Sequence, residues 1–124
     1  MPSTLKDICF DCTDQLKVAR FWADVFDYEM SPLDRPADPT EPICITPNGN
    51  GGTRMWFNQV PEPRNGKNRV HIDINMSSKE EMRRLRRLGA MMVQEVRGED
   101  GDLWWTVMCD PEGNEFCAFP PRQG

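Results

Sequence analysis

The chain repeats itself at a constant offset of 64 residues. The matched pairs are Asp7 and His71, Cys12 and Met76, Pro47 and Pro111, Gly49 and Gly113, and Asn50 and Asn114. One spacing relates two strand-like segments and two turns, which indicates an internal duplication. A chain of 124 residues has room for one domain. We therefore expect a single domain made of two similar modules, about 1–60 and 69–124, joined by a linker over 61–68.

Both halves show the same opening elements. Residues 6–12 alternate apolar and polar side chains, as a strand with one buried face does, and 15–28 has helical apolar spacing after a cap at Thr13 or Asp14. In the second half, a strand-like stretch at 69–76 precedes Ser77 or Ser78 and a helical segment with early acids, late arginines and Gly89 as its C-cap.

Each half has space for three more short strands after its helix. The expected strands are 28–32, 42–46 and 53–60 in the first half, and 91–96, 103–109 and 114–119 in the second. One βαβββ unit would leave a sheet face bare, so two units side by side would bury it. The predicted fold is α+β, with two βαβββ modules in tandem forming a curved mixed sheet around a central cleft, and the helices outside.

Charge and composition restrict the partners. The net charge is −5 and the pI about 4.9, whereas binding to nucleic acid needs a basic surface. No apolar run approaches the roughly 18 residues of a membrane span, and no export signal is present, so the five cysteines are expected to be reduced thiols. We expect a cytoplasmic protein with a small-molecule ligand, and no nucleic-acid or membrane partner. Because exposed sheet edges can pair with another chain, a homodimer is one alternative that the sequence does not decide.

Aromatic side chains on the predicted strands indicate the kind of ligand. By strand alternation, one residue of each adjacent aromatic pair faces the cleft and the other packs against a helix. Trp56 shares a face with Asn58 and would line the cleft. The candidate ligand-binding residues are Trp56, Asn58, Trp104, Trp105 and Phe119. Such a wall suits a planar or apolar small molecule, although the same rings could simply fill the core.

Three stretches carry a family resemblance: FWADVFDY at 21–28, RVHIDI at 69–74 and DPEGNEFCAF at 110–119. They resemble the vicinal oxygen chelate superfamily, the group of glyoxalases, bleomycin-resistance proteins and extradiol dioxygenases. The stretch VPEPRNGKNRVHIDI, from residue 60 to 74, resembles the linker of its compact glyoxalase-like domains.

The resemblance implies metal ligands on the first and last strands of each module. Carried over to this sequence, the positions are Asp7, Asn58 or Gln59, His71 and Cys117. Only His71 is the residue that the metal-binding pattern expects. Asp7, His71 and Cys117 are the candidate ligands for a divalent metal such as Zn, Fe, Ni or Mn. Because a neutral amide is a poor ligand for these metals, we expect no cofactor.

The chemistry of the cleft depends mainly on His71, the single histidine of the chain. It could act as a metal ligand, as a general base or as a hydrogen-bonding residue of the cleft wall. Glu115 should share a face with Cys117 and is a second candidate catalytic acid. Cys117 itself could be a nucleophile or an inert buried thiol.

Three functions remain open. The chain could be a lyase or isomerase-type enzyme acting on a small carbonyl or hydroxylated compound. It could be a non-catalytic binding protein, as in the bleomycin-resistance branch, or a module with a vestigial cleft. The retained histidine and tryptophans favour a small-molecule-binding domain, with catalysis undecided.

Overall fold

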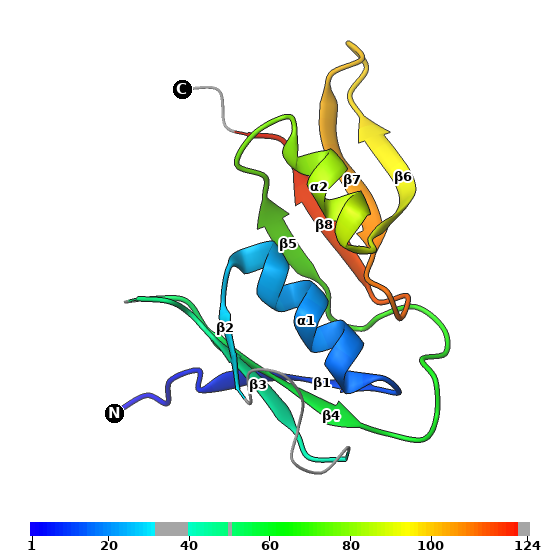
Figure 1. Cartoon of the computed structure of the whole chain (residues 1–124). Helices are drawn as coiled ribbons and strands as arrows, with labels where there is room; N and C mark the ends of the chain where they lie inside the picture. The colour runs from blue at the N-terminus through cyan, green and yellow to red at the C-terminus, as the bar shows by residue number, and fades with distance from the viewer. Residues whose placement is uncertain (32–39, 50, 122–124) are drawn as a thin grey trace. The chain divides into compact units, whose positions relative to one another are not determined.

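The computed structural model describes residues 1–31, 40–49 and 51–121. It divides into two compact units, Met1–Pro63 and Arg64–Gly124, and each contains a strand, a helix and three further strands (Figure 1). The first unit comprises β1 (Asp7–Cys12), α1 (Gln15–Phe26), β2 (Glu29–Ser31), β3 (Ile43–Thr46) and β4 (Arg54–Gln59). The second comprises β5 (Ile72–Asn75), α2 (Glu81–Leu88), β6 (Met91–Arg97), β7 (Leu103–Cys109) and β8 (Glu115–Phe119).

The two sheets have the same topology. Their strand orders are β1-β4-β3-β2 and β5-β8-β7-β6. In each, the first and last strands of the unit pair in parallel, and the other neighbours pair antiparallel. The predicted α+β class and the two βαβββ modules in tandem are confirmed.

The strand register refines the repeat. Cys9 pairs with Trp56 in the first sheet, and Asp73 pairs with Cys117 in the second. Cys9 and Asp73 differ by 64 positions, but Trp56 and Cys117 differ by 61. The first unit therefore has three more residues in the turn before its last strand, where Gly51 and Gly52 have positive φ angles. Asn50, which the sequence pattern matched to Asn114, lies outside the described residues.

Helix α1 covers the first sheet closely. It begins because the Asp14 side chain accepts a hydrogen bond from the backbone N–H of Lys17 at 3.1 Å, as a capping residue does. It ends at Phe26, two residues before the predicted end, because Asp27 adopts a left-handed conformation with φ 56°. Its buried apolar residues are Val18, Ala19, Phe21, Trp22 and Ala23. These side chains fill the core of the first unit.

Helix α2 covers the second sheet more sparsely. Its N-cap is Glu80, which makes no side-chain capping bond. Gly89 ends the helix as predicted, with φ 120°. Leu85 is the only residue of α2 that is fully buried, because its eight residues provide little more than two turns. Both helices in the described ranges are too short and too polar to cross a membrane.

The turn before β8 has a structural role. Asp110 is fully buried, and its Oδ1 accepts hydrogen bonds from the backbone N–H of Glu112 at 2.9 Å and of Asn114 at 3.0 Å. Its Oδ2 accepts from the Asn114 side chain at 2.9 Å. Gly113 has φ 90°, a conformation that disfavours other residues. The acidic-Pro-Gly-Asn motif therefore fixes the geometry with which β8 begins.

Candidate functional site

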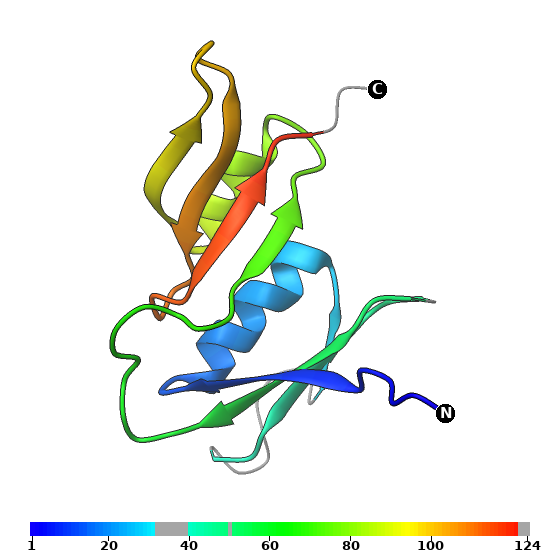
Figure 2. The same ribbon diagram turned by 180° about the vertical axis from the view of Figure 1, so that it is seen from behind.

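Alternation along the strands gives the second sheet two faces. The face under α2 carries buried side chains, including Thr106, Met108, Phe116 and Ala118. We call the opposite face, which is turned to the viewer in Figure 2, the distal face. It carries most of the predicted site residues of this unit: His71, Trp105, Glu115, Cys117 and Phe119, together with Asp73.

His71 is paired with a carboxylate on the distal face. The sequence pattern placed His71 inside a strand over 69–76, but β5 begins at Ile72, so the histidine precedes the strand by one residue. Its Nε2 lies 3.1 Å from Asp73 Oδ1, and the two side chains are 54% and 57% exposed. A neutral imidazole that donates from Nε2 keeps the Nδ1 lone pair available. The pair can therefore accept a proton or hold a hydroxyl or carbonyl group.

Cys117 lies next to this pair. It is directly opposite Asp73 in the parallel pairing of β5 with β8. Burial raises the pKa of the Cys117 thiol, the charges of Asp73 and Glu115 raise it further, and Lys67 opposes them. A thiol with a raised pKa is a poor nucleophile at neutral pH. The surroundings of Cys117 therefore favour the inert-thiol interpretation.

The distal face also has an aromatic surface. The rings of Trp105 on β7 and Phe119 on β8 have centroids 5.7 Å apart and an interplanar angle of 34°. Both side chains are half-buried. They form an apolar surface on the same side of the sheet as His71 and Cys117.

Trp104 is the neighbour of Trp105 on β7 and lies at an irregularity of the sheet. The pairing of β6 with β7 runs from Val96–Trp105 to Arg97–Leu103, which leaves Trp104 as the extra residue of a bulge. Its ring lies against Gly98, where an added Cβ would come within 2.8 Å of the indole. Trp104 lines a cavity on the α2 side of the sheet. The Trp104 ring also lies beside that of Trp105, with centroids 6.2 Å apart and an interplanar angle of 27°.

Glu115 is held in an ion pair. Its Oε1 lies 3.0 Å from Lys67 Nζ, and the Glu115 side chain is 26% exposed. As predicted, it shares its face with Cys117. The lysine competes with any substrate for this carboxylate, so the geometry favours His71 over Glu115 as a proton acceptor.

In the first unit, Asp7 is occupied by three donors. Lys6 Nζ lies 2.8 Å from Oδ2, Arg54 Nε lies 2.9 Å from Oδ1, and Trp56 Nε1 donates to Oδ2 at 2.8 Å. The hydrogen bond from Lys6, with those from Trp56 and Arg54, lowers the pKa of Asp7 to about 2. A metal at Asp7 would have to displace these partners. The sequence did not reveal Arg54, because its contact depends on the parallel register of β1 with β4.

Trp56 and Asn58 lie beside Asp7 on the face of the first sheet opposite α1. A shallow hollow of about 370 Å³ there is lined by Lys6, Asp7, Cys9, Pro42, Trp56 and Asn58. Trp56, and not Asn58, holds the position that corresponds to Cys117, because Cys9–Trp56 and Asp73–Cys117 are equivalent pairs. The metal position carried over to Asn58 therefore lies on the same face as the equivalent of Cys117, but two residues further along β4.

Three side chains of the second unit bring possible metal donors together within the described ranges. One atom each from His71, Asp73 and Cys117 lies within 4.8 Å of the other two. A nitrogen, an oxygen and a sulfur donor suit Zn²⁺, whereas Mn²⁺ prefers oxygen donors. The distal face thus offers three donors for zinc, two of which, His71 and Cys117, are among the predicted ligands.

Comparisons with known proteins agree with this fold. A family model described as "Glyoxalase-like domain" matches residues 7–119. A point mutant of the fosfomycin resistance protein FosX from Listeria monocytogenes, complexed with Mn(II) and 1S,2S-dihydroxypropylphosphonic acid, is 18% identical, covers 98% of this chain and 93% of its own, and has a TM-score of 0.70. FosX from Mesorhizobium loti is 18% identical, with coverages of 96% and 92% and a TM-score of 0.65.

A third solved structure, a glyoxalase-related enzyme from Fulvimarina pelagi, is 17% identical, with coverages of 96% and 88% and a TM-score of 0.64. A search of curated protein sequences found no match. At these identities the solved structures establish a shared fold, and the family model covers nearly the whole chain. The chain therefore belongs to the glyoxalase-like domain family, within the vicinal oxygen chelate superfamily.

Proposed function

We propose that this protein binds a small molecule on the distal face of its second sheet. The ligand has a planar or apolar body and a carbonyl or hydroxyl group. The observation that carries the proposal is the His71–Asp73 pair, at 3.1 Å, on the same face as the Trp105–Phe119 pair, at 5.7 Å. Small-molecule sites combine an apolar surface with a few polar groups that set the orientation.

The aromatic pair would supply most of the affinity. Stacked and tilted rings stabilise a contact by about 0.5–1.5 kcal/mol beyond the burial of their area. The imidazole would orient the ligand, because a neutral Nδ1 accepts a hydrogen bond from a hydroxyl and a protonated ring donates one to a carbonyl. Cys117, with its raised pKa, would contribute a small apolar surface between them.

A second candidate function is proton transfer, and the same His71–Asp73 contact favours it. A carboxylate that accepts a hydrogen bond from one imidazole nitrogen orients the other nitrogen as a general base. His71 could then remove a proton from a carbon next to a carbonyl group, as an isomerase or lyase requires. The occupied Asp7 favours the non-catalytic function, because one predicted ligand position already has its partners.

We propose separately that the distal face can bind a divalent metal. His71, Asp73 and Cys117 would hold Zn²⁺, which supplies Lewis-acid polarisation of a bound oxygen when present. Coordination requires the thiolate, so a metal would have to overcome the raised pKa of Cys117.

We also propose an oligomeric state for the protein. The edge strand β6 exposes Met91, Met92 and Val93, and an exposed apolar edge is suited to pairing with another copy. We propose a homodimer in the cytoplasm with no nucleic-acid partner. Light scattering coupled to size exclusion should give twice the mass of 14.3 kDa; a single-chain mass would contradict it.

The binding proposal can be tested with a panel of small aromatic ketones, aldehydes and phenols. Calorimetry should find ligands that lose about tenfold or more in affinity with Trp105→Ala or Phe119→Ala. Met92→Ala is the control, because Met92 lines the cavity on the α2 side of the sheet, and it should leave affinity within about twofold. Equal losses at Met92 and Trp105 would contradict the proposed face.

The same ligands separate binding from catalysis. If His71 only orients the ligand, His71→Gln should weaken binding and no product should form with the wild type. Turnover that disappears in His71→Gln while affinity stays within a few-fold would establish the enzymatic function instead.

A further inference from the structure

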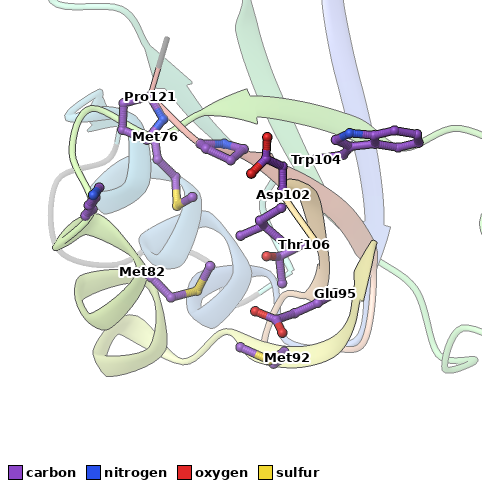
Figure 3. A pocket seen from close by; sticks show the side chains of 11 residues that line it. Met76, Met82, Met92, Glu95, Asp102, Trp104, Thr106 and Pro121 are labelled. Carbon is purple, nitrogen blue, oxygen red and sulfur yellow. The ribbon is translucent and has the colours of Figure 1, made fainter. Parts of the chain in front are cut away.

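The second unit has a cavity on the side of the sheet opposite its distal face. The cavity has a volume of about 720 Å³ and lies between α2 and strands β6 and β7 (Figure 3). Its lining includes Met76, Met82, Met92, Glu95, Asp102 and Thr106. None of these residues belongs to the site proposed above.

The cavity exists because α2 is short. In the first unit, the twelve residues of α1 bury large side chains, including Phe21 and Trp22, against the sheet. In the second unit, the eight residues of α2 bury Leu85 alone. The flexible side chains of Met76 and Met82 border the remaining space, and thioethers adapt to ligands of different shapes.

Thr106 gives the cavity a polar group without a partner. The residue is completely buried, and its Oγ1 has no hydrogen-bond partner among the described residues. A buried hydroxyl without a partner is costly and calls for an explanation. Because Thr106 forms part of the cavity wall (Figure 3), a ligand that reaches the hydroxyl after the methionines rearrange would satisfy it.

The charges around Thr106 indicate which ligand fits. In the view of Figure 3, the carboxylates of Asp102 and Glu95 lie on either side of Thr106. Glu95 is 3.2 Å from Arg97, whereas Asp102 has no ion pair within the described parts of the chain. Lys79 is the only cation among the described lining residues, against the two carboxylates of Glu95 and Asp102, so acidic groups outnumber basic ones in the lining.

We propose that this cavity is a second binding site, which takes a compact apolar molecule carrying a protonated amine. An ammonium group has three N–H donors, two of which match the Thr106 hydroxyl oxygen and the Asp102 carboxylate, whereas Glu95 is already paired with Arg97. The methionine side chains contact the apolar body.

Three probes of one shape test the charge requirement: adamantan-1-amine, adamantan-1-ol and adamantane-1-carboxylate. The readout is the NMR spectrum of protein labelled with ¹³C at the methionine methyl groups, of which the chain has eight. The amine should shift Met76, Met82 and Met92. Met30 and Met55, which are buried in the first unit, should not move.

We expect the amine to bind about tenfold or more tightly than the alcohol, and the carboxylate to cause no shifts. Asp102→Asn should reduce amine affinity about tenfold and leave alcohol affinity within twofold. Glu99→Gln is the charge-matched control outside the cavity lining and should change neither. Equal binding of amine and carboxylate would overturn the proposal, as would shifts confined to other methionines or no shift with any probe.

A cavity-filling variant gives an independent check. Met82→Trp should abolish the amine-induced shifts of Met76 and Met92 while the protein keeps a cooperative thermal transition. If folded Met82→Trp still binds the amine with wild-type affinity, the ligand lies elsewhere and the proposed site is wrong.

Discussion

Thr106→Val should make the free protein more stable. Thr106 is 0% exposed and its hydroxyl oxygen has no partner in the described structure. A buried polar group without a hydrogen bond costs about 1–3 kcal/mol, and valine replaces the hydroxyl with a methyl group of similar shape. Valine also suits the β7 strand. Allowing for local relaxation, we expect a gain of about 1 kcal/mol in the free energy of unfolding.

Urea denaturation followed by circular dichroism should show a higher midpoint with an unchanged slope. In thermal unfolding, the gain corresponds to a rise in Tm of about 3–6 °C for a domain of this size. The matched control is Thr46→Val in β3, because the Thr46 hydroxyl lies 3.7 Å from Cys44 Sγ. That variant should show no gain.

The prediction distinguishes a binding role for Thr106 from a structural one. If the hydroxyl serves a ligand, Thr106→Val stabilises the protein and weakens adamantan-1-amine binding. A loss of stability of 0.5 kcal/mol or more would mean that the hydroxyl has a partner in solution, and it would refute the reasoning about an unsatisfied group.

Three further predictions concern single side chains. The folded pKa of Asp7, about 2, lies below its ordinary value of 3.8, so its contribution to stability is present above about pH 4 and is lost as the pH falls toward 2; Asp7→Asn should flatten the acid denaturation profile there, and an unchanged profile would contradict the ion pairs. Asp110→Ala removes the acceptor of three hydrogen bonds and should cost about 2–4 kcal/mol in urea denaturation; a cost below 1 kcal/mol would exclude the proposed role of this turn. Iodoacetamide at pH 7 should modify the exposed Cys9 well before Cys117, whose pKa is raised by burial, and the reverse order by mass spectrometry would point to a thiolate on the distal face.

The order of elements could be predicted from the sequence because the duplication constrains it twice. A strand pattern, a capped helix and a turn recur at one offset, and each occurrence supports the other. The offset of 64 was read as constant, but it falls to 61 at the last strands. Gly51 and Gly52 lengthen the first turn, and turns tolerate such insertions without a change in the sheet.

The composition of the site was harder to predict, because it depends on strand register. Alternation placed Glu115 and Cys117 on one face, and the structure agrees. The bulge at Trp104 breaks that alternation, and no pattern of residues in the sequence predicted a bulge there. The partners of Asp7 lie across a parallel pairing between β1 and β4, so their contact could be recognised only after the register was known.

The cavity beside α2 depends on a helix that buries few side chains against the sheet. Met82, Leu85 and Leu88 recur at helical spacing, as a buried stripe does, yet Leu85 is the one residue of α2 that is fully buried. Periodicity gives the direction of a side chain, not its distance from the sheet. The space at Met82 therefore had no signature in the sequence.

The proposed binding of a small molecule to the distal face depends on the aromatic pair and on His71. The four tryptophans provide the most direct test, because ¹⁵N-labelled indoles give one NMR signal each. Titration with the aromatic ketones, aldehydes and phenols should shift Trp105 together with the His71 ring, and leave the buried Trp22 unchanged. Ligands that bind with measurable affinity but move neither Trp105 nor His71 would contradict the claim, as would a complete panel that produces no shift at all.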